Sequence, residues 1–203
     1  MNPNCSTIQS VLALNLINKK YKLMEVNYTT LQAVSGSGYI GLLDLINSLE
    51  GKKCIFYEKQ IAFNILPVIG ELDNQGNSVE ETKMINETKR IFEDQDLKVT
   101  ATCIRVPVVN SHSISINLVC HNNIEKEALI DELKKDKYLK IYDFDYPTPK
   151  QVSGTDEVHI GRIRQIGNNG LSLWVVADNL RVGAATNAIR ILEKLWKEII
   201  NDI

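Results

Sequence analysis

Apolar and polar residues recur along the chain with two periods, and together they predict a mixture of helices and strands. The largely apolar run from Val11 to Ile17 predicts a buried helix over residues 6–18. Residues 23–32 alternate between two faces, as in a strand. Further helices are predicted at residues 39–49, 78–93, 124–135 and 183–200. Further extended segments are predicted at residues 54–57, 61–69, 97–109, 113–120, 158–165 and 171–177.

This alternation of helical and extended patterns is typical of α/β and α+β domains. Segments 97–109 and 113–120 are close in sequence, and we expect them to pair as antiparallel strands around Asn110–His112. No linker rich in Pro, Gly or Ser divides the chain. We therefore expect one domain, or one domain with an appendage.

The first residues place a cysteine where a loop turns into a helix. Ser6 and Gln9 match the Ser-x-x-Gln pattern of a capping box, so Cys5 is expected at the helix N-terminus. There, free backbone N–H groups and the positive end of the helix dipole stabilise a thiolate, the nucleophilic form of cysteine. The alternative is a small core cysteine beside a helix cap, since free cysteine is often buried.

Composition excludes several classes of protein. The chain has 203 residues, 44% of them hydrophobic, and a net charge of -2, with an isoelectric point near 6.0. Such a balance offers no electrostatic footprint for nucleic acid. No apolar run is long enough to span a membrane, and the first residues lack the charged and apolar regions expected of a signal peptide. We therefore expect a cytoplasmic protein.

The four cysteines are scattered and have no close histidine partner. We expect neither disulfides nor a metal site.

A glycine-rich loop follows the strand at 23–32. Residues Gly36 to Gly41 match G-x-G-x-x-G, and Glu58 lies near the spacing of a ribose ligand in dinucleotide-binding folds. The preceding strand is polar on one face, however, and no second βαβ half follows. A dinucleotide fingerprint, a plain strand-to-helix turn and a loop that shapes an active site all remain open.

Several polar residues stand in positions that require a partner. Ser78 or Asn77 is expected to cap a helix on which Glu80 and Lys83 share one face. Arg105 interrupts an apolar strand, where an unpaired charge is costly, so it needs a protein carboxylate or an anionic ligand. His112 lies just past that strand and is either structural or catalytic.

Five motifs occur in order and carry a resemblance to a known family. They are Asn2–Gln9, Leu31–Gly38, Glu80–Met84, Cys103–Val108 with Ser111–Ser113, and Asp178–Arg181 with Gly183–Asn187. Over essentially the whole chain they resemble the aspartate-semialdehyde dehydrogenases. The run Asn-Pro-Asn-Cys-Ser-Thr favours this family over the related acetylglutamyl-phosphate reductases, which differ around their cysteine.

The resemblance implies an α+β fold: a large mixed sheet with helices packed on one face, like the C-terminal domain of glyceraldehyde-3-phosphate dehydrogenase. Residues 1–182 would form the catalytic and dimerisation domain. Residues 183–203 would form a helix that packs on a nucleotide-binding domain.

The resemblance also implies a reaction. The family reduces aspartyl 4-phosphate to aspartate semialdehyde and inorganic phosphate with NADPH, in the biosynthesis of lysine, methionine and threonine. Cys5 would be the nucleophile that forms a thioester, and His112 would be the acid/base. Gln32 would orient the substrate beside the sulfur, and Asn4 would help with the thioester oxygen.

The remaining implied roles concern binding. Arg105 would hold the substrate carboxylate, Glu80 its ammonium group and Lys83 the phosphate. Ser35 and Gly36 would lie against the nicotinamide of NADP, and Asn187 would face the cofactor side.

Family members also carry an N-terminal nucleotide-binding domain with a phosphate loop, which nothing in this chain matches. We therefore expect weak NADP binding and negligible turnover by the chain alone, and a homodimer or homotetramer. Two alternatives remain. The chain could be a complementing subunit that binds a separate nucleotide-binding partner, or the glycine loop could bind a dinucleotide by itself.

Overall fold

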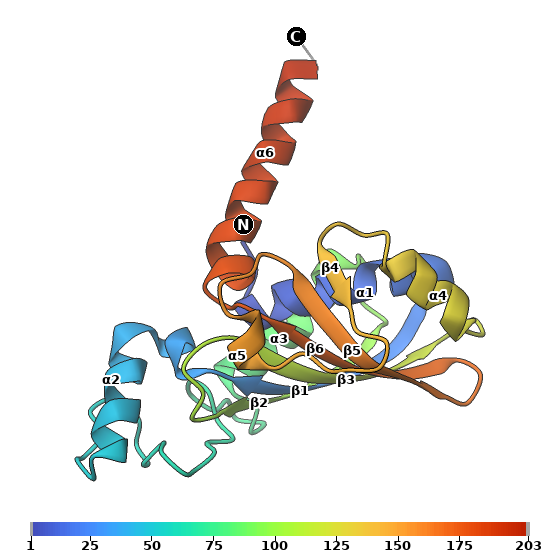
Figure 1. The fold of residues 1–203 in the computed structure, drawn as a ribbon. Helices are drawn as coiled ribbons and strands as arrows, with labels where there is room; N and C mark the ends of the chain where they lie inside the picture. Colours follow the sequence, from blue (N-terminus) through green and yellow to red (C-terminus); the bar gives the residue numbers. More distant parts are fainter. Residues whose placement is uncertain (1, 202–203) are drawn as a thin grey trace.

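The computed structural model describes residues 2–201 of the chain (Figure 1). Its α-helices are α1 (Cys5–Tyr21), α2 (Gly38–Leu49), α3 (Val79–Ile91), α4 (Lys126–Leu133), α5 (Pro149–Val152) and α6 (Thr186–Asn201). A 3-10 helix, η1 (Val34–Ser37), precedes α2, and a π-helix, η2 (Arg181–Ala185), precedes α6. Its strands are β1 (Leu23–Gln32), β2 (Lys98–Arg105), β3 (His112–Cys120), β4 (Leu139–Ile141), β5 (Val158–Ile166) and β6 (Gly170–Ala177).

The strands form one six-stranded sheet in the order β2-β1-β3-β6-β5-β4. β1 is parallel to β2 and β4 to β5, whereas the other neighbours are antiparallel. Helices α1, α3 and α4 bury their apolar sides in one cluster with the strands, and they lie on one face of the sheet (Figure 1). The predicted α+β fold, with helices on one face of a mixed sheet, is confirmed.

The main core lies between this face and α1. Leu14 and Ile17 of α1 are fully buried in the same cluster as Val26 and Tyr28 of β1. Because side chains on a strand alternate between faces, Gln32 at the end of β1 lies on the covered face as well, and it is 1% exposed. A polar side chain is thus buried where the strand ends beside α1.

The predicted pairing of 97–109 with 113–120 is wrong, because β1 lies between β2 and β3. Residues 106–111 instead wrap around the end of β1. Three backbone N–H···O=C bonds hold this connection: Val106 to Gln32 (3.0 Å), Val34 to Val108 (2.8 Å) and Ser35 to Val109 (3.2 Å). The alternation of apolar and polar residues in two segments does not reveal whether another strand lies between them, so the pattern alone could not identify β1 as the neighbour of both.

α2 and the loop after it form a lobe at one end of the sheet (Figure 1). A small second core holds this lobe: Val34, Leu45, Ile61 and Ala62. The extended segments predicted at 54–57 and 61–69 are wrong. Apart from a single bridge between Leu66 and Arg105, both are irregular, and the Asp44 carboxylate binds the backbone N–H groups of residues 55–57 at 2.7–2.8 Å.

α6 projects away from the sheet and its helices (Figure 1). Its apolar side is 37–64% exposed at Ile189, Ile191, Leu192, Leu195 and Trp196. The helix predicted from residue 183 begins as η2 and becomes α-helical at Thr186. Of the predicted C-terminal unit, residues 202 and 203 lie outside the described residues. None of the helices within residues 2–201 combines the length and the apolar character needed to cross a bilayer.

Glu81 joins α3 to the outer edge of β2. Its carboxylate accepts the N–H of Ser78 at 2.7 Å, in a capping box that confirms Ser78 as the cap, and the N–H of Cys103 at 2.9 Å. The side chain is 7% exposed. One buried carboxylate therefore satisfies a helix start and a strand edge together.

We expect Glu81→Ala to lower the free energy of unfolding by about 2 kcal/mol or more, because it leaves two buried N–H donors without an acceptor. Urea unfolding followed by circular dichroism measures this loss. Glu93→Ala is the matched control, since Glu93 is exposed beyond the end of α3. Equal losses in the two variants would contradict this role for Glu81.

Candidate active site

Cys5 is the first residue of α1, and Asn4 caps this helix. The Asn4 Oδ1 atom accepts hydrogen bonds from the backbone N–H of Ser6 at 2.8 Å and of Thr7 at 3.2 Å. The predicted capping box of Ser6 and Gln9 is wrong, because both residues are fully buried within α1. Cys5 starts the helix as expected, but Asn4 already occupies two of the free N–H groups there.

The resting form of Cys5 is the thiol. Burial by surrounding protein atoms, followed by the negative charge of Glu80, raises the thiol pKa from 9.0 to about 11. A hydrogen bond from the Ser6 N–H and the positive charge of Arg105 oppose this rise without cancelling it. The stabilised thiolate expected from the helix start is therefore wrong for this state of the molecule. Part of the side chain still reaches the surface.

The peptide groups of Ala33 bring two predicted site residues together. The Ala33 N–H donates to His112 Nδ1 at 3.0 Å, and Arg105 Nη1 donates to the Ala33 carbonyl at 2.6 Å. Gln32 lies opposite Arg105 in the pairing of β1 with β2. The connection around the end of β1 thus gathers Gln32, Arg105 and His112 from three strands.

His112 is a neutral hydrogen-bond donor. Because Nδ1 accepts from a peptide N–H, the proton of the neutral ring is on Nε2. Burial, with the nearby Arg105 charge, lowers its pKa from 6.5 to about 3, so the ring stays neutral at physiological pH. Within residues 2–201, Nε2 is buried and has no hydrogen-bond partner. Its N–H is therefore available to a ligand oxygen.

Arg105 is a buried cation that no carboxylate of residues 2–201 neutralises. It is 5% exposed, makes no ion pair there, and its Nε atom is buried without a partner. Burying a guanidinium without an anion is costly. Of the two partners open from the sequence, a ligand anion fits better than a protein carboxylate.

The Gly36 backbone lies close to Arg105 and His112. A Cβ at this position would lie 2.7 Å from Arg105 Nη1 and 3.2 Å from His112 Nε2. The glycine itself is exposed. Of the three interpretations of the glycine loop, the structure supports a loop that shapes the site: β1 leads through η1 into α2, and the sheet is mixed rather than doubly wound.

Glu80 reaches the start of α1 from the first turn of α3. Its Oε1 atom accepts hydrogen bonds from Asn4 Nδ2 at 2.6 Å and from Gln32 Nε2 at 3.2 Å. The carboxylate is half-buried, and within residues 2–201 both donors are neutral amides. Glu80, like Arg105, borders Gln32 and lacks an ion-pair partner there. Lys83 lies one turn further along α3 and is exposed, outside this cluster.

The other two residues predicted for the cofactor make hydrogen bonds to different partners. Ser35 Oγ bonds to the side chains of Asn110 at 3.0 Å and Asn179 at 3.2 Å. Asn187, near the start of α6, donates to Asn2 Oδ1 at 2.7 Å. No hydrogen bond among the described residues joins Asn187 to Ser35, so their common role stays a prediction.

Gly183 is a site residue to which sequence reasoning assigned no role. A Cβ on Gly183 would lie 2.8 Å from the Cβ atom and 3.2 Å from the Cα atom of Cys5. Any larger residue would displace the backbone around Cys5. The only signal in the sequence was the position of Gly183 in a motif, since the contact spans almost the whole chain.

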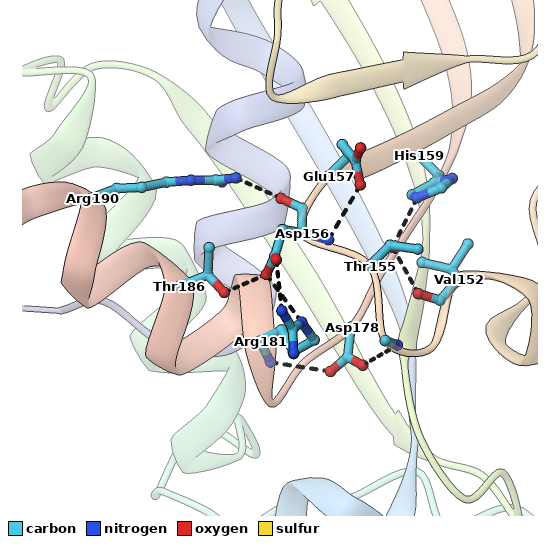
Figure 2. A network of polar contacts seen from close by, with 10 residues as sticks. Val152, Thr155, Asp156, Glu157, His159, Asp178, Arg181, Thr186 and Arg190 are labelled. Carbon is cyan, nitrogen blue, oxygen red and sulfur yellow. Dashed lines mark hydrogen bonds and ion pairs between the residues drawn. The ribbon is translucent and has the colours of Figure 1, made fainter.

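A polar network fixes η2, as Figure 2 shows, and Gly183 of η2 lies against Cys5. The Asp156 carboxylate accepts from Arg181 at 2.7 and 3.1 Å and from Thr186 at 2.5 Å, and its carbonyl accepts from Arg190 at 2.7 Å. Asp178 binds the N–H groups of residues 180, 181 and 154 at 2.8–3.1 Å. These two aspartates join the sheet to the start of α6, and neither was predicted.

We expect iodoacetamide to alkylate Cys5 slowly at neutral pH, with a rate that rises about tenfold per pH unit up to about pH 10. The alkylation rate rises with pH because the reactive thiolate forms only as the pH approaches the raised thiol pKa of about 11. Mass spectrometry of the labelled peptide measures the rate, with Cys5→Ala as the control for other thiols. A plateau below about pH 8.5, the ordinary thiol range, would contradict the raised pKa.

Comparisons with known proteins agree with this geometry. The family model described as "Semialdehyde dehydrogenase, dimerisation domain" matches residues 14–182. The aspartate-semialdehyde dehydrogenase of Aquifex aeolicus is 45% identical over 210 residues, covering 97% of this chain and 62% of the relative.

Two solved structures are also similar. Aspartate semialdehyde dehydrogenase II of Vibrio cholerae, complexed with ASA, has a TM-score of 0.92 at 38% identity, covering 97% of this chain and 61% of that chain. The Candida albicans enzyme with NADP has a TM-score of 0.72 at 27% identity, covering 94% and 55%. The chain thus spans less than two thirds of the length of these relatives. It belongs to the semialdehyde dehydrogenase dimerisation-domain family.

Proposed function

We propose that this chain forms the thiol-bearing catalytic portion of an aspartate-semialdehyde dehydrogenase. The observation that carries the proposal is a pair of opposite charges without ion-pair partners in residues 2–201. Arg105 and Glu80 both border Gln32, next to Cys5 and His112. An α-amino acid has one carboxylate and one ammonium group, and it would neutralise both charges. Aspartate semialdehyde and aspartyl phosphate have this pair together with a reactive carbonyl.

Cys5 would attack that carbonyl. In the biosynthetic direction the sulfur displaces phosphate from aspartyl phosphate and forms a thioester. Lys83, exposed beside the cluster, would attract the phosphate. Gln32 and Asn4 hold Glu80 in place for the substrate ammonium. The further role predicted for Asn4, at the thioester oxygen, stays a prediction.

His112 would act on the carbonyl oxygen. Its Nε2–H is preformed, buried and free to donate. It would donate a hydrogen bond to that oxygen and stabilise its negative charge, both in acyl transfer and when hydride adds to the thioester carbonyl. The carbon–sulfur bond of the resulting hemithioacetal oxyanion then breaks, the aldehyde leaves, and Cys5 is released as the thiolate. The acid/base role predicted for His112 stays a prediction.

NADP would lie at Gly36. Gly36 is exposed, and a Cβ there would contact both Arg105 Nη1 and His112 Nε2, so the absence of a side chain would let a flat ring approach these two groups. When bound, NADP supplies or accepts the hydride. Ser35, which precedes Gly36, and Asn187, near the start of α6, would hold the nicotinamide end. We further propose a homodimer, in line with the dimerisation-domain family, and a contact between the apolar side of α6 and a nucleotide-binding domain.

We expect aspartate semialdehyde to protect Cys5 from iodoacetamide. In Arg105→Lys, the concentration that gives half protection should rise about ten- to a hundredfold, because an ammonium cannot replace a bidentate guanidinium. Arg164→Lys is the matched control, since Arg164 is exposed on β5. Butanal lacks both charged groups. Equal protection by butanal, or an unchanged Arg105→Lys variant, would contradict the proposal.

A second candidate is a complementing subunit without chemistry of its own, which the exposed apolar side of α6 favours. Co-expression with the nucleotide-binding part of the Aquifex aeolicus relative separates the two candidates. We expect an assembly that oxidises aspartate semialdehyde with NADP and phosphate, and Cys5→Ala should abolish this turnover. An assembly without turnover would instead support the second candidate.

A further inference from the structure

The groups that could stabilise a Cys5 thiolate are already engaged. Asn4 Oδ1 occupies the N–H groups of Ser6 and Thr7, which would otherwise face the helix start. Arg105 directs Nη1 at the Ala33 carbonyl at 2.6 Å. In this state, the Ser6 N–H that acts on Cys5 is shared with Asn4, and its hydrogen bond does not offset the effect of burial on the thiol pKa.

A negative charge stands beside the same thiol. Glu80 Oε1 lies 2.6 Å from Nδ2 of Asn4, the residue that precedes Cys5. The other bond to this carboxylate comes from Gln32, which is also neutral. A carboxylate next to a thiol opposes loss of the thiol proton.

Other ionisable groups near Cys5 are already engaged. Glu81 binds backbone N–H groups of Ser78 and Cys103, and Glu87 binds the Asn4 N–H at 2.8 Å. From β3, His112 presents a neutral ring.

On η2, Arg181 is paired with Asp156. Arg105 on β2 and Glu80 on α3 are the two charges that act directly on the sulfur, with opposite signs. Of the two, Glu80 disfavours the nucleophile.

We propose that the Glu80 carboxylate, in addition to burial, disfavours the Cys5 thiolate until a ligand ammonium group pairs with that carboxylate. The ammonium of the substrate would then do more than bind. It would cancel the negative charge beside the sulfur, so that more thiolate forms with an amino acid in the site than with a carboxylate ligand that lacks the ammonium group. The inference rests on the proposed function for the identity of that amino acid. It makes Glu80 a specificity-determining residue, because an aldehyde without an ammonium group meets an unactivated thiol.

The first test needs no ligand. Glutamine at position 80 can still accept both hydrogen bonds, from Asn4 and Gln32, while it removes the charge. We expect Glu80→Gln to give about three- to tenfold more Cys5 thiolate at about pH 9 than the unaltered chain. The ultraviolet absorbance of the thiolate measures this, as the difference from the same chain with Cys5→Ser. Glu93→Gln, the same change at an exposed site, should not alter the titration.

The second test adds the ammonium group as a ligand. 2-Aminobutanoate and butanoate share a carboxylate for Arg105, but only the first has an ammonium group. At concentrations that protect Cys5 from iodoacetamide, 2-aminobutanoate should give several-fold more thiolate than butanoate. In Glu80→Gln this difference should disappear, because the carboxylate that distinguishes the two ligands is absent.

Identical thiolate titrations of the unaltered chain and Glu80→Gln would overturn the inference, whether or not aspartate semialdehyde protects Cys5 from iodoacetamide. Equal thiolate with the two ligands would overturn it as well. Failure of aspartate semialdehyde to protect Cys5 would instead count against the proposed function, and the ligand-free titration would keep its meaning. The two failures are therefore distinguishable.

Discussion

The candidate site depends on one crossing of the backbone, where residues 106–111 pass around the end of β1. This crossing presents the Ala33 N–H to His112 and the Ala33 carbonyl to Arg105. Both side chains are thereby fixed by the peptide groups of one residue, which the hydrogen bonds of its neighbours hold between β1 and η1. The proton of His112 is then confined to Nε2, and the guanidinium is held near the imidazole without pairing to an acid of residues 2–201. The protonation of His112 and the position of the Arg105 charge therefore both depend on the backbone conformation at the end of β1.

Much of this arrangement was predictable because it is local. The alternation of residues 23–32 predicts β1 correctly, and the polar residues before Val79 predict the cap at Ser78. The argument about Arg105 also needed only its neighbours, since a charge in an apolar strand requires compensation wherever that strand lies. The motif resemblance added the family, which the match over residues 14–182 confirms.

The rest depended on contacts between residues far apart in sequence. Nothing near residues 97–120 indicates that β1 lies between the two strands, so their pairing was mispredicted. The cap of α1 was assigned to Ser6 rather than Asn4 because both residue types cap helices well. The state of Cys5 was mispredicted for a related reason: the helix start was visible in the sequence, whereas the Glu80 carboxylate arrives from another helix.

The π-helix η2, between the sheet and α6, provides the contact of Gly183 with Cys5 and also determines the rotation of α6 about its own axis. In η2 the Ala185 N–H bonds to the Leu180 carbonyl, five residues back, at 3.3 Å, whereas an α-helix closes over four. Each residue of an α-helix advances its rotation by about 100°. One residue more or fewer in η2 would turn the side of α6 bearing Leu192 and Trp196 by that angle while Gly183 stayed against Cys5. The five residues of η2 thus fix the direction of the apolar side of α6 relative to Cys5.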